Sequence, residues 1–245
     1  MSDSDEPKKK RKPRRKKIGR APKHMVILKN KDKSCHETRR DRDSVLRFTH
    51  PFRCCILGQV NSGKSLIMKN LLMAQQGRNP KFQQLIVINP NLGTREYEDL
   101  DPTELRNTIP DMNELDPGIK KLIVIDDFEF HLLSKEQTRR ISELFRYGSS
   151  HINTSIILCH QNFFRIPKSC KDNSNVFIIF RPNDSDELKT IARRVGMDGM
   201  KMVDLFKTIL PNFRDSLTIN LIPNWPHRYY KNLFDPIAGI ESDSE

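Results

Sequence analysis

The residues best suited to chemistry form one uninterrupted run in which glycines, a lysine and a serine stand at fixed spacing. The run consists of Gly58, Gln59, Val60, Asn61, Ser62, Gly63, Lys64 and Ser65. This is the spacing of a phosphate-binding loop, in which glycines let successive backbone N–H groups turn toward an anion. We predict that the loop binds ATP, with Lys64 on the β- and γ-phosphates and Ser65 holding Mg²⁺.

The alternative for this run is a surface loop that matches the pattern by chance. The sequence around it favours the phosphate loop, because residues 53–57 read as a short buried strand and residues 64–76 have apolar residues at helical spacing. A helix that begins at the end of the loop would point its positive N-terminal end at the bound phosphate. The loop therefore has the strand-then-helix context that nucleotide binding requires.

Two adjacent carboxylates follow another apolar run. The run is residues 122–125, and Asp126 and Asp127 come directly after it. We expect Asp126 to coordinate Mg²⁺ through water and Asp127 to polarise the attacking water. Many ATPases with a phosphate loop have Glu at this position. The side chain of Asp127 is one methylene shorter than that Glu. The alternative is an Asp pair that caps the next segment.

A polar amide follows the strand-like residues 155–159. Gln161 can both donate and accept a hydrogen bond, and at the end of a strand beside the carboxylates it would sense the γ-phosphate. The alternative is a solvated turn residue. His151 and His160 flank this strand without a second ligand at metal spacing, so we predict structural or hydrogen-bonding roles for them.

Apolar runs without alternation predict strands that are buried on both faces, and they alternate with helix-like segments, which is typical of parallel βαβ units. The predicted strands are 53–57, 85–88, 122–125, 155–159, 176–180 and 217–222, and the predicted helices are 64–76 ended by Gly77, 135–147 ended by Gly148, and 185–195. Residues 91–118 predict one short helix at most. We therefore predict an α/β fold of the P-loop NTPase class (RecA/ASCE-like), a mostly parallel sheet flanked by helices, with the nucleotide at the carboxyl ends of the strands.

Charge is distributed unevenly along the 245 residues, since +8 of the net charge of +12 falls within residues 1–23. We predict a disordered basic tail and linker at 1–44, an ATPase domain at 45–236 and an acidic tail at 237–245. The five cysteines have no zinc-like spacing, which predicts a reducing compartment and no structural metal. The chain shows neither a secretory signal nor a membrane span, so we expect a soluble intracellular protein without a membrane partner.

The order of these motifs resembles the FtsK–HerA superfamily of DNA-translocating ATPases. The branch it is most similar to is the viral genome-packaging ATPases of poxvirus type, including those of Maverick/Polinton-like and adintovirus-like elements. The resemblance covers about Phe48 to Pro236. Its further motifs are Gly148-Ser149-Ser150-His151 with Asn153 and Ser155, Gln161-Asn162-Phe163-Phe164, Phe180-Arg181-Pro182-Asn183-Asp184, and Tyr230-Lys231-Asn232-Leu233-Phe234-Asp235-Pro236.

The resemblance implies a homo-oligomeric ring around double-stranded DNA, in which ATP hydrolysis between subunits drives the DNA into a preformed capsid. Viral capsid proteins are then partners. Such motors usually supply an arginine finger from the neighbouring subunit, often near the segment that is GSSH here. Arg146 is the nearest upstream candidate, Arg165 and Arg181 are others, and the alternative for each is an ordinary surface arginine.

A compact basic run lies near the N-terminus, where nine of the ten residues Lys8–Lys17 are Lys or Arg. It predicts binding to a nuclear import receptor and hence location in the host nucleus. Association with the virion is implied by the resemblance to packaging motors. The same run would suit phosphate contacts with nucleic acid, which weaken steeply with salt, or would serve as a solubilising tail.

Two other functions stay open from the sequence. A P-loop kinase acting on a nucleotide or small molecule needs an arginine-rich lid, and residues 165–194 contain Arg165, Arg181, Arg193 and Arg194. A nucleotide-gated, non-catalytic DNA-binding or assembly protein would bind ATP and hardly turn it over. The Asp126–Asp127 pair and Gln161 favour the motor.

Overall fold

The computed structural model describes residues 48, 50–76, 82–94, 96–223 and 227–240 of the chain. The predicted basic tail and linker at 1–44, the helix stop at Gly77 and the last five residues lie outside these ranges. No helix among the described residues is long and apolar enough to cross a bilayer.

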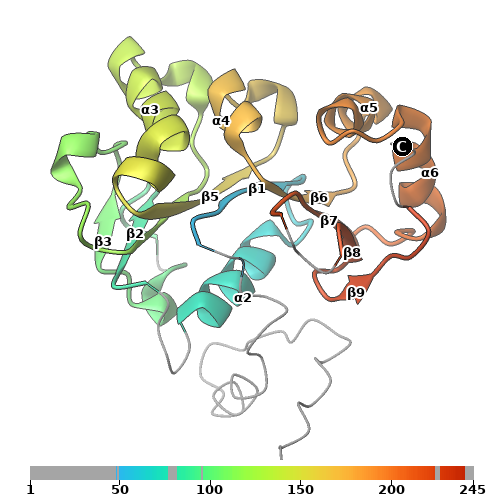
Figure 1. Ribbon diagram of the computed structural model, residues 1–245, viewed down its shortest axis with the longest axis horizontal. Coiled ribbons are helices and arrows are strands. Elements are labelled where there is room, and N and C mark those ends of the chain that lie inside the picture. Colours follow the sequence, from blue (N-terminus) through green and yellow to red (C-terminus); the bar gives the residue numbers. More distant parts are fainter. Residues whose placement is uncertain (1–47, 49, 77–81, 95, 224–226, 241–245) are drawn as a thin grey trace, which may run out of the picture.

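The described residues form a nine-stranded sheet with the order β3-β2-β4-β5-β1-β6-β7-β8-β9 (Figure 1). The strands are β1 (Arg53–Leu57), β2 (Gln84–Ile88), β3 (Glu104–Arg106), β4 (Lys121–Ile125), β5 (Thr154–His160), β6 (Val176–Phe180), β7 (Ser216–Asn220), β8 (Tyr229–Lys231) and β9 (Asp235–Pro236). The pairs from β3 through to β6 are parallel, and β7, β8 and β9 are added antiparallel. The predicted α/β fold with a mostly parallel sheet is therefore confirmed.

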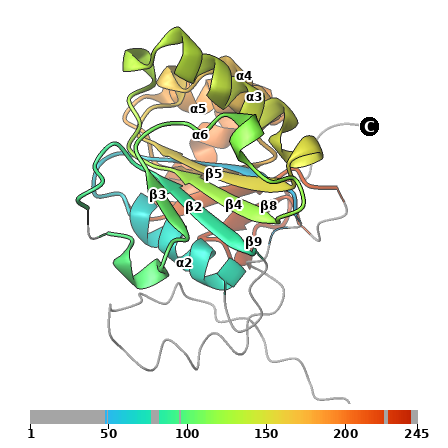
Figure 2. The same cartoon turned by 90° about the vertical axis from the view of Figure 1, so that its left-hand side faces the viewer.

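Helices cover both faces of the sheet. They are α2 (Lys64–Gln76), α3 (Lys135–His151), α4 (Lys168–Asn173), α5 (Ser185–Arg194) and α6 (Gly199–Thr208), with single 3₁₀ turns η1 (Glu98–Leu100), η2 (Met112–Glu114), η3 (Phe130–Leu132) and η4 (Phe163–Arg165). Figure 1 shows α3, α4, α5 and α6 on one side of the sheet and α2 on the other, and the side view in Figure 2 shows the same layers.

The uniform apolar runs of the central strands follow from these two layers. Successive side chains of a strand point to opposite faces. In β1, Cys55 and Leu57 join the core beneath α3 to α6, whereas Cys54 and Ile56 join the core against α2. Neither face is exposed to water, so an apolar residue is favoured at every position.

The structure differs from the prediction in the bounds of some elements and in elements that the prediction omits. The helix expected to stop at Gly148 continues to His151, because Gly148 is buried among Leu144 and Ile152 and acts as a small packing residue within α3. The strand expected at 217–222 is β7, and it is followed by β8 and β9. The predictions also omit β3, α4 and α6; β3 has only three residues and α4 only six, so neither carries a full period of apolar residues.

Arg181, one of the candidates for an arginine finger, is engaged within its own chain. It follows β6, and its guanidinium donates to the backbone carbonyls of Phe206, in the last turn of α6, and of Leu210, just after that helix. The last carbonyls of a helix lack partners inside the helix, so a cation placed there both satisfies them and complements the helix dipole.

We expect Arg181→Ala to lower the free energy of unfolding by about 1.5–3 kcal/mol, the usual contribution of hydrogen bonds to a charged group. The matched control is Arg165→Ala, because Arg165 is an exposed arginine whose loss should change stability by about 0.5 kcal/mol or less. Urea unfolding of both variants measures the difference. Equal stabilities would contradict the capping role of Arg181.

Candidate active site

The predicted phosphate loop lies where β1 ends and α2 begins. Its backbone curls tightly: Ser62 N donates to Gln59 O at 3.3 Å, and Ile67 N donates to Gly63 O at 3.0 Å. Gly63 has a φ of +111°, which a side chain would strain, and Asn61 has a φ of +63°, a left-handed conformation that Asn tolerates better than most residues. The turn itself therefore requires the glycine at Gly63 and favours the asparagine at Asn61.

Gly58 is required by close packing rather than by its φ. A Cβ added at Gly58 would lie 2.6 Å from Ser62 Oγ and 2.7 Å from Phe180 Cβ, both shorter than real contacts. The Gly58 N–H donates to the carbonyl of His160 at 3.2 Å, which ties the loop to the end of β5. The first residue of the loop is therefore fixed by two neighbouring strands, β5 and β6.

The ammonium group of Lys64 folds back over the loop. Nζ donates to Gln59 O at 2.7 Å, and the side chain is buried. Burial lowers the pKa of Lys64, and the charges of Cys159, Asp127 and Asp126 act in the opposite direction. The lysine and both predicted carboxylates are thus close enough to interact electrostatically.

Asp126 and Asp127 follow the end of β4, and they differ in their exposure to solvent. Asp126 is 3% exposed, its N–H donates to Ile88 O at 3.0 Å, and its Oδ2 accepts a hydrogen bond from the Tyr97 hydroxyl. Burial raises the pKa of Asp126 to about 6, and the Tyr97 hydrogen bond opposes this effect. Asp127 has a φ of +54° and is exposed. The sharp turn at Asp127 separates a buried carboxylate from one that faces solvent.

A hollow of about 430 Å³ opens at this edge of the sheet. The loops after four strands line it, together with the last residue of β5, His160: Gln59 and Val60 follow β1, Asp127, Phe128 and Glu129 follow β4, Gln161, Asn162 and Arg165 follow β5, and Asn183 follows β6. The sheet order explains the convergence, because β5 lies between β4 and β1. The structure therefore brings Gln59 and Val60 of the predicted phosphate loop to the same hollow as Asp127 and Gln161, whereas Lys64, Ser65 and Asp126 are not among the residues that line it.

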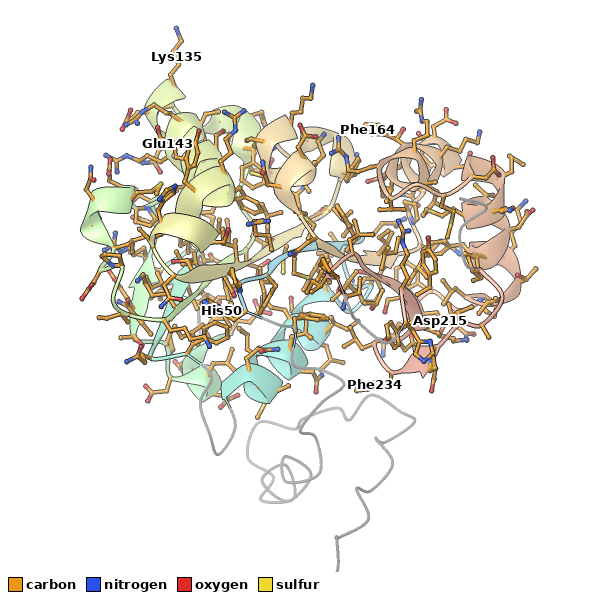
Figure 3. All side chains as sticks on the ribbon, in the orientation of Figure 1. His50, Lys135, Glu143, Phe164, Asp215 and Phe234 are labelled. Carbon is orange, nitrogen blue, oxygen red and sulfur yellow. The ribbon has the colours of Figure 1, made fainter. Side chains whose placement is uncertain are left out.

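The loop after β5 is held from two directions. Glu187 on α5 is buried, and its Oε1 accepts a hydrogen bond from Phe163 N at 2.5 Å. Burial raises the pKa of Glu187, while the same hydrogen bond lowers it. On the other side, Arg165 Nη1 lies 3.8 Å from Glu129 Oε2. Phe164, at the middle of η4, is half exposed, and Figure 3 shows it on the same side of the sheet as α4 and α5.

Arg146 lies apart from this group. It is exposed on the C-terminal half of α3, a helix that runs from the end of β4 to the start of β5, away from the hollow. Figure 3 shows Lys135, the first residue of α3, extending away from the sheet. Of the three arginines considered for a finger, Arg165 is the one that lines the hollow of its own chain.

Sequence reasoning missed several residues of the site. Glu129 and Asn183 line the hollow, and Asn89 and Tyr97 lie beside Asp126. Asn89 could have been predicted as a site residue, because it directly follows β2 as Asp126 directly follows the adjacent β4. Tyr97 could not have been predicted, since it lies in the irregular stretch after β2 and contacts Asp126 only because of how that loop folds.

His160 has the hydrogen-bonding role that the sequence predicts. Its Nδ1 lies 3.0 Å from the backbone N and 2.8 Å from the backbone O of Asn162, and its ring packs 5.3 Å from that of Phe130. Burial lowers the pKa of His160, although the hydrogen bond to Asn162 opposes this. The neutral ring is therefore the form that the fold accommodates.

Comparison with known proteins gives matches of structure alone. No family model matches the sequence, and no curated protein matches it. The genome packaging NTPase B204 from Sulfolobus turreted icosahedral virus 2, in complex with AMP, superposes with a TM-score of 0.57 over 78% of this chain and 100% of its own, at 15% identity.

Two other solved structures give similar values. The DNA-packaging ATPase B204 from Sulfolobus Turreted Icosahedral Virus has a TM-score of 0.55 and 17% identity over 77% of this chain and 100% of its own. The pCW3 conjugation coupling protein TcpA with ATPγS has a TM-score of 0.51 and 14% identity over 76% of this chain and 60% of its own. At these identities the likeness establishes the fold, that of a P-loop NTPase.

The buried His160 predicts loss of stability in mild acid. Because its pKa is lowered in the folded state, the unfolded chain binds a proton first, near the ordinary value of 6.5. The stabilisation is complete above that pH and is lost below it. Relative to His160→Gln, the wild type should lose up to about 1.4 kcal/mol per pH unit below about pH 6.5, measured by urea unfolding. Parallel curves for the two proteins would contradict this.

Proposed function

We propose that this protein hydrolyses ATP to move double-stranded DNA and package a viral genome into a preformed capsid. The observation that carries the proposal is the convergence of Gln59 and Val60 of the phosphate loop with Asp127 and Gln161 around one hollow. The likeness of the fold to the two B204 packaging proteins supports it. Assignment to the FtsK–HerA superfamily, and to its poxvirus-type branch with Maverick/Polinton- or adintovirus-like elements, rests on the sequence resemblance.

The residues at the loop fit an ATP–Mg²⁺ complex. The curled backbone from Gly58 to Gly63 and the start of α2 would cradle the phosphates, and Lys64 would neutralise them. Ser65 and Asp126 offer only oxygen atoms as ligands, which Mg²⁺ prefers. When bound, Mg²⁺ would stabilise the charge that develops on the transferred phosphoryl group.

The remaining side chains have distinct roles in this proposal. Asp127, exposed at the hollow, would orient and polarise the attacking water. Gln161 would contact the γ-phosphate and report its presence through the loop after β5. An arginine from a neighbouring subunit, for which Arg146 is our candidate, would complete the site in a ring around DNA. Capsid proteins, and a nuclear import receptor bound by Lys8–Lys17, would be the further partners, in the host nucleus and the virion.

The kinase alternative loses support from the arginines that would form its lid. Arg181 donates to the end of α6, Arg194 pairs with Asp172, and Arg193 Nη2 bonds Thr190 at 3.2 Å. Only Arg165 of the four lines the hollow among the described residues. A lid of several free arginines is therefore not what residues 165–194 provide.

Steady-state ATP hydrolysis, measured with and without linear duplex DNA, tests the proposed function. We expect DNA to stimulate the wild type, and Lys64→Ala to lower hydrolysis by about a hundredfold or more, as expected on removing a charge that stabilises the transition state. ATP binding without hydrolysis under either condition would contradict a stand-alone motor and favour a nucleotide-gated assembly protein. Hydrolysis that needs a small-molecule acceptor would favour the kinase.

Two neighbouring carboxylates allow a sharp test of the predicted base. Asp127→Asn should lower the rate of hydrolysis by about 10²–10⁴-fold while ATP binding persists, because the variant loses the group that accepts a proton. Glu129→Gln is the matched control, since Glu129 also lines the hollow but is engaged with Arg165. A larger loss in Glu129→Gln would transfer the role of base to Glu129.

A further inference from the structure

Asp126 is held by a side chain that belongs to none of the sequence motifs. We propose that Tyr97 is a positioning residue, which fixes the Asp126 carboxylate so that Oδ1 is presented to the cation bound with the nucleotide. The inference rests on the proposed function, because it assigns Tyr97 a role in the same site. Tyr97 would touch neither nucleotide nor cation, and would act only through Asp126.

The contact with Asp126 leaves one carboxylate oxygen available. Tyr97 is 2% exposed, and its hydroxyl donates to Asp126 Oδ2. Among the described residues, Asp126 Oδ1 accepts no hydrogen bond. The χ2 torsion of an aspartate is broad, so the backbone alone does not fix the plane of the carboxylate. The Tyr97 donor on one of the two equivalent oxygens fixes that plane and leaves the other oxygen for a ligand.

A second buried side chain sets the direction of the Tyr97 hydroxyl. Asn89 is 4% exposed, and its Nδ2 donates to Tyr97 Oη at 3.4 Å. The orientation of the amide follows from its other end, because Asn89 Oδ1 accepts a hydrogen bond from Asn91 N at 2.8 Å. With its lone pair facing Asn89, the single hydrogen of the Tyr97 hydroxyl is left for Asp126.

The backbone holds this chain of donors in place at the ends of adjacent strands. Asn89 N donates to Arg106 O at 2.9 Å, and Asp126 N donates to Ile88 O at 3.0 Å. These hydrogen bonds therefore connect the end of β3 with Asn89 after β2, and Asn89 through Tyr97 with Asp126 after β4. Partners of this kind, which orient a metal ligand without touching the metal, commonly change metal affinity by about 10- to 100-fold when they are removed.

The experiment compares the full-length protein with Tyr97→Phe, which keeps the buried ring and removes only the hydroxyl. The affinity for AMPPCP, an ATP analogue that is not hydrolysed, is measured by calorimetry in Mg²⁺ and again in EDTA. We expect Tyr97→Phe to lose about tenfold of the affinity in Mg²⁺ and to keep that in EDTA. Mn²⁺ binding to the AMPPCP complex, followed by electron paramagnetic resonance, should weaken by the same factor.

Tyr229→Phe is the matched control, because Tyr229 is an equally buried tyrosine on β8, away from the site. It should bind AMPPCP as the wild type does in both buffers. Asn89→Ala leaves Tyr97 in place but removes the group that directs its hydroxyl, so a smaller loss confined to the Mg²⁺ condition is expected. This variant also keeps the inference testable if Tyr97→Phe does not fold.

Asp126→Asn separates failure of the inference from failure of the proposed function. If Asp126→Asn loses Mg²⁺-dependent affinity but Tyr97→Phe and Asn89→Ala match the wild type, the positioning role of Tyr97 is overturned and the site stands. If the wild type binds AMPPCP equally in Mg²⁺ and EDTA, or not at all, both are overturned. A loss in EDTA as large as that in Mg²⁺ would make Tyr97 a structural residue only.

Discussion

Burial of the central strands on both faces is the constraint on which the site depends. Every residue of β4, β5 and β6 is buried, and β1 is buried after its first residue. An uncompensated polar group inside such strands is costly, so charged side chains gather where the strands end. The parallel arrangement then brings several ends to one edge, and the hollow forms where the loops after β1, β4, β5 and β6 meet.

The same constraint explains what the sequence predicted well. Continuous apolar runs identified the five central strands, and they placed Asp126, Asp127 and Gln161 just after the ends of two of these strands. The short strands β3, β8 and β9 have no such run. Helix α6 did carry a signal, because Asp198 caps it by accepting from Met200 N and Lys201 N, and apolar residues follow at helical spacing. Tyr97 could not be predicted, since its contact depends on how a loop folds back over the ends of β2 and β4.

The edge of the sheet is built from loops that hold one another. The loop after β1 is bonded to β5 through Gly58 N and His160 O, and the loop after β5 is bonded to α5 through Phe163 N and Glu187. The loop after β2 reaches Asp126 through Tyr97. The loops after β1 and β5 are therefore each held by another element, and Asp126 is held by the loop after β2, which is the kind of support that keeps a site preorganised.

The place of β1 between β5 and β6 also determines when the site can form during synthesis. The strand that carries the phosphate loop is made first, yet its two partners come last among the parallel strands. The bond between Phe52 N and Ser155 Oγ spans 103 residues, and that between Arg53 N and Asn175 Oδ1 spans 122. Such long-range pairing is slow to form. Most of the chain must therefore be synthesised before β1 can pair with β5 and β6. Products truncated before β5 will contain the whole phosphate-loop motif without the strands that hold it.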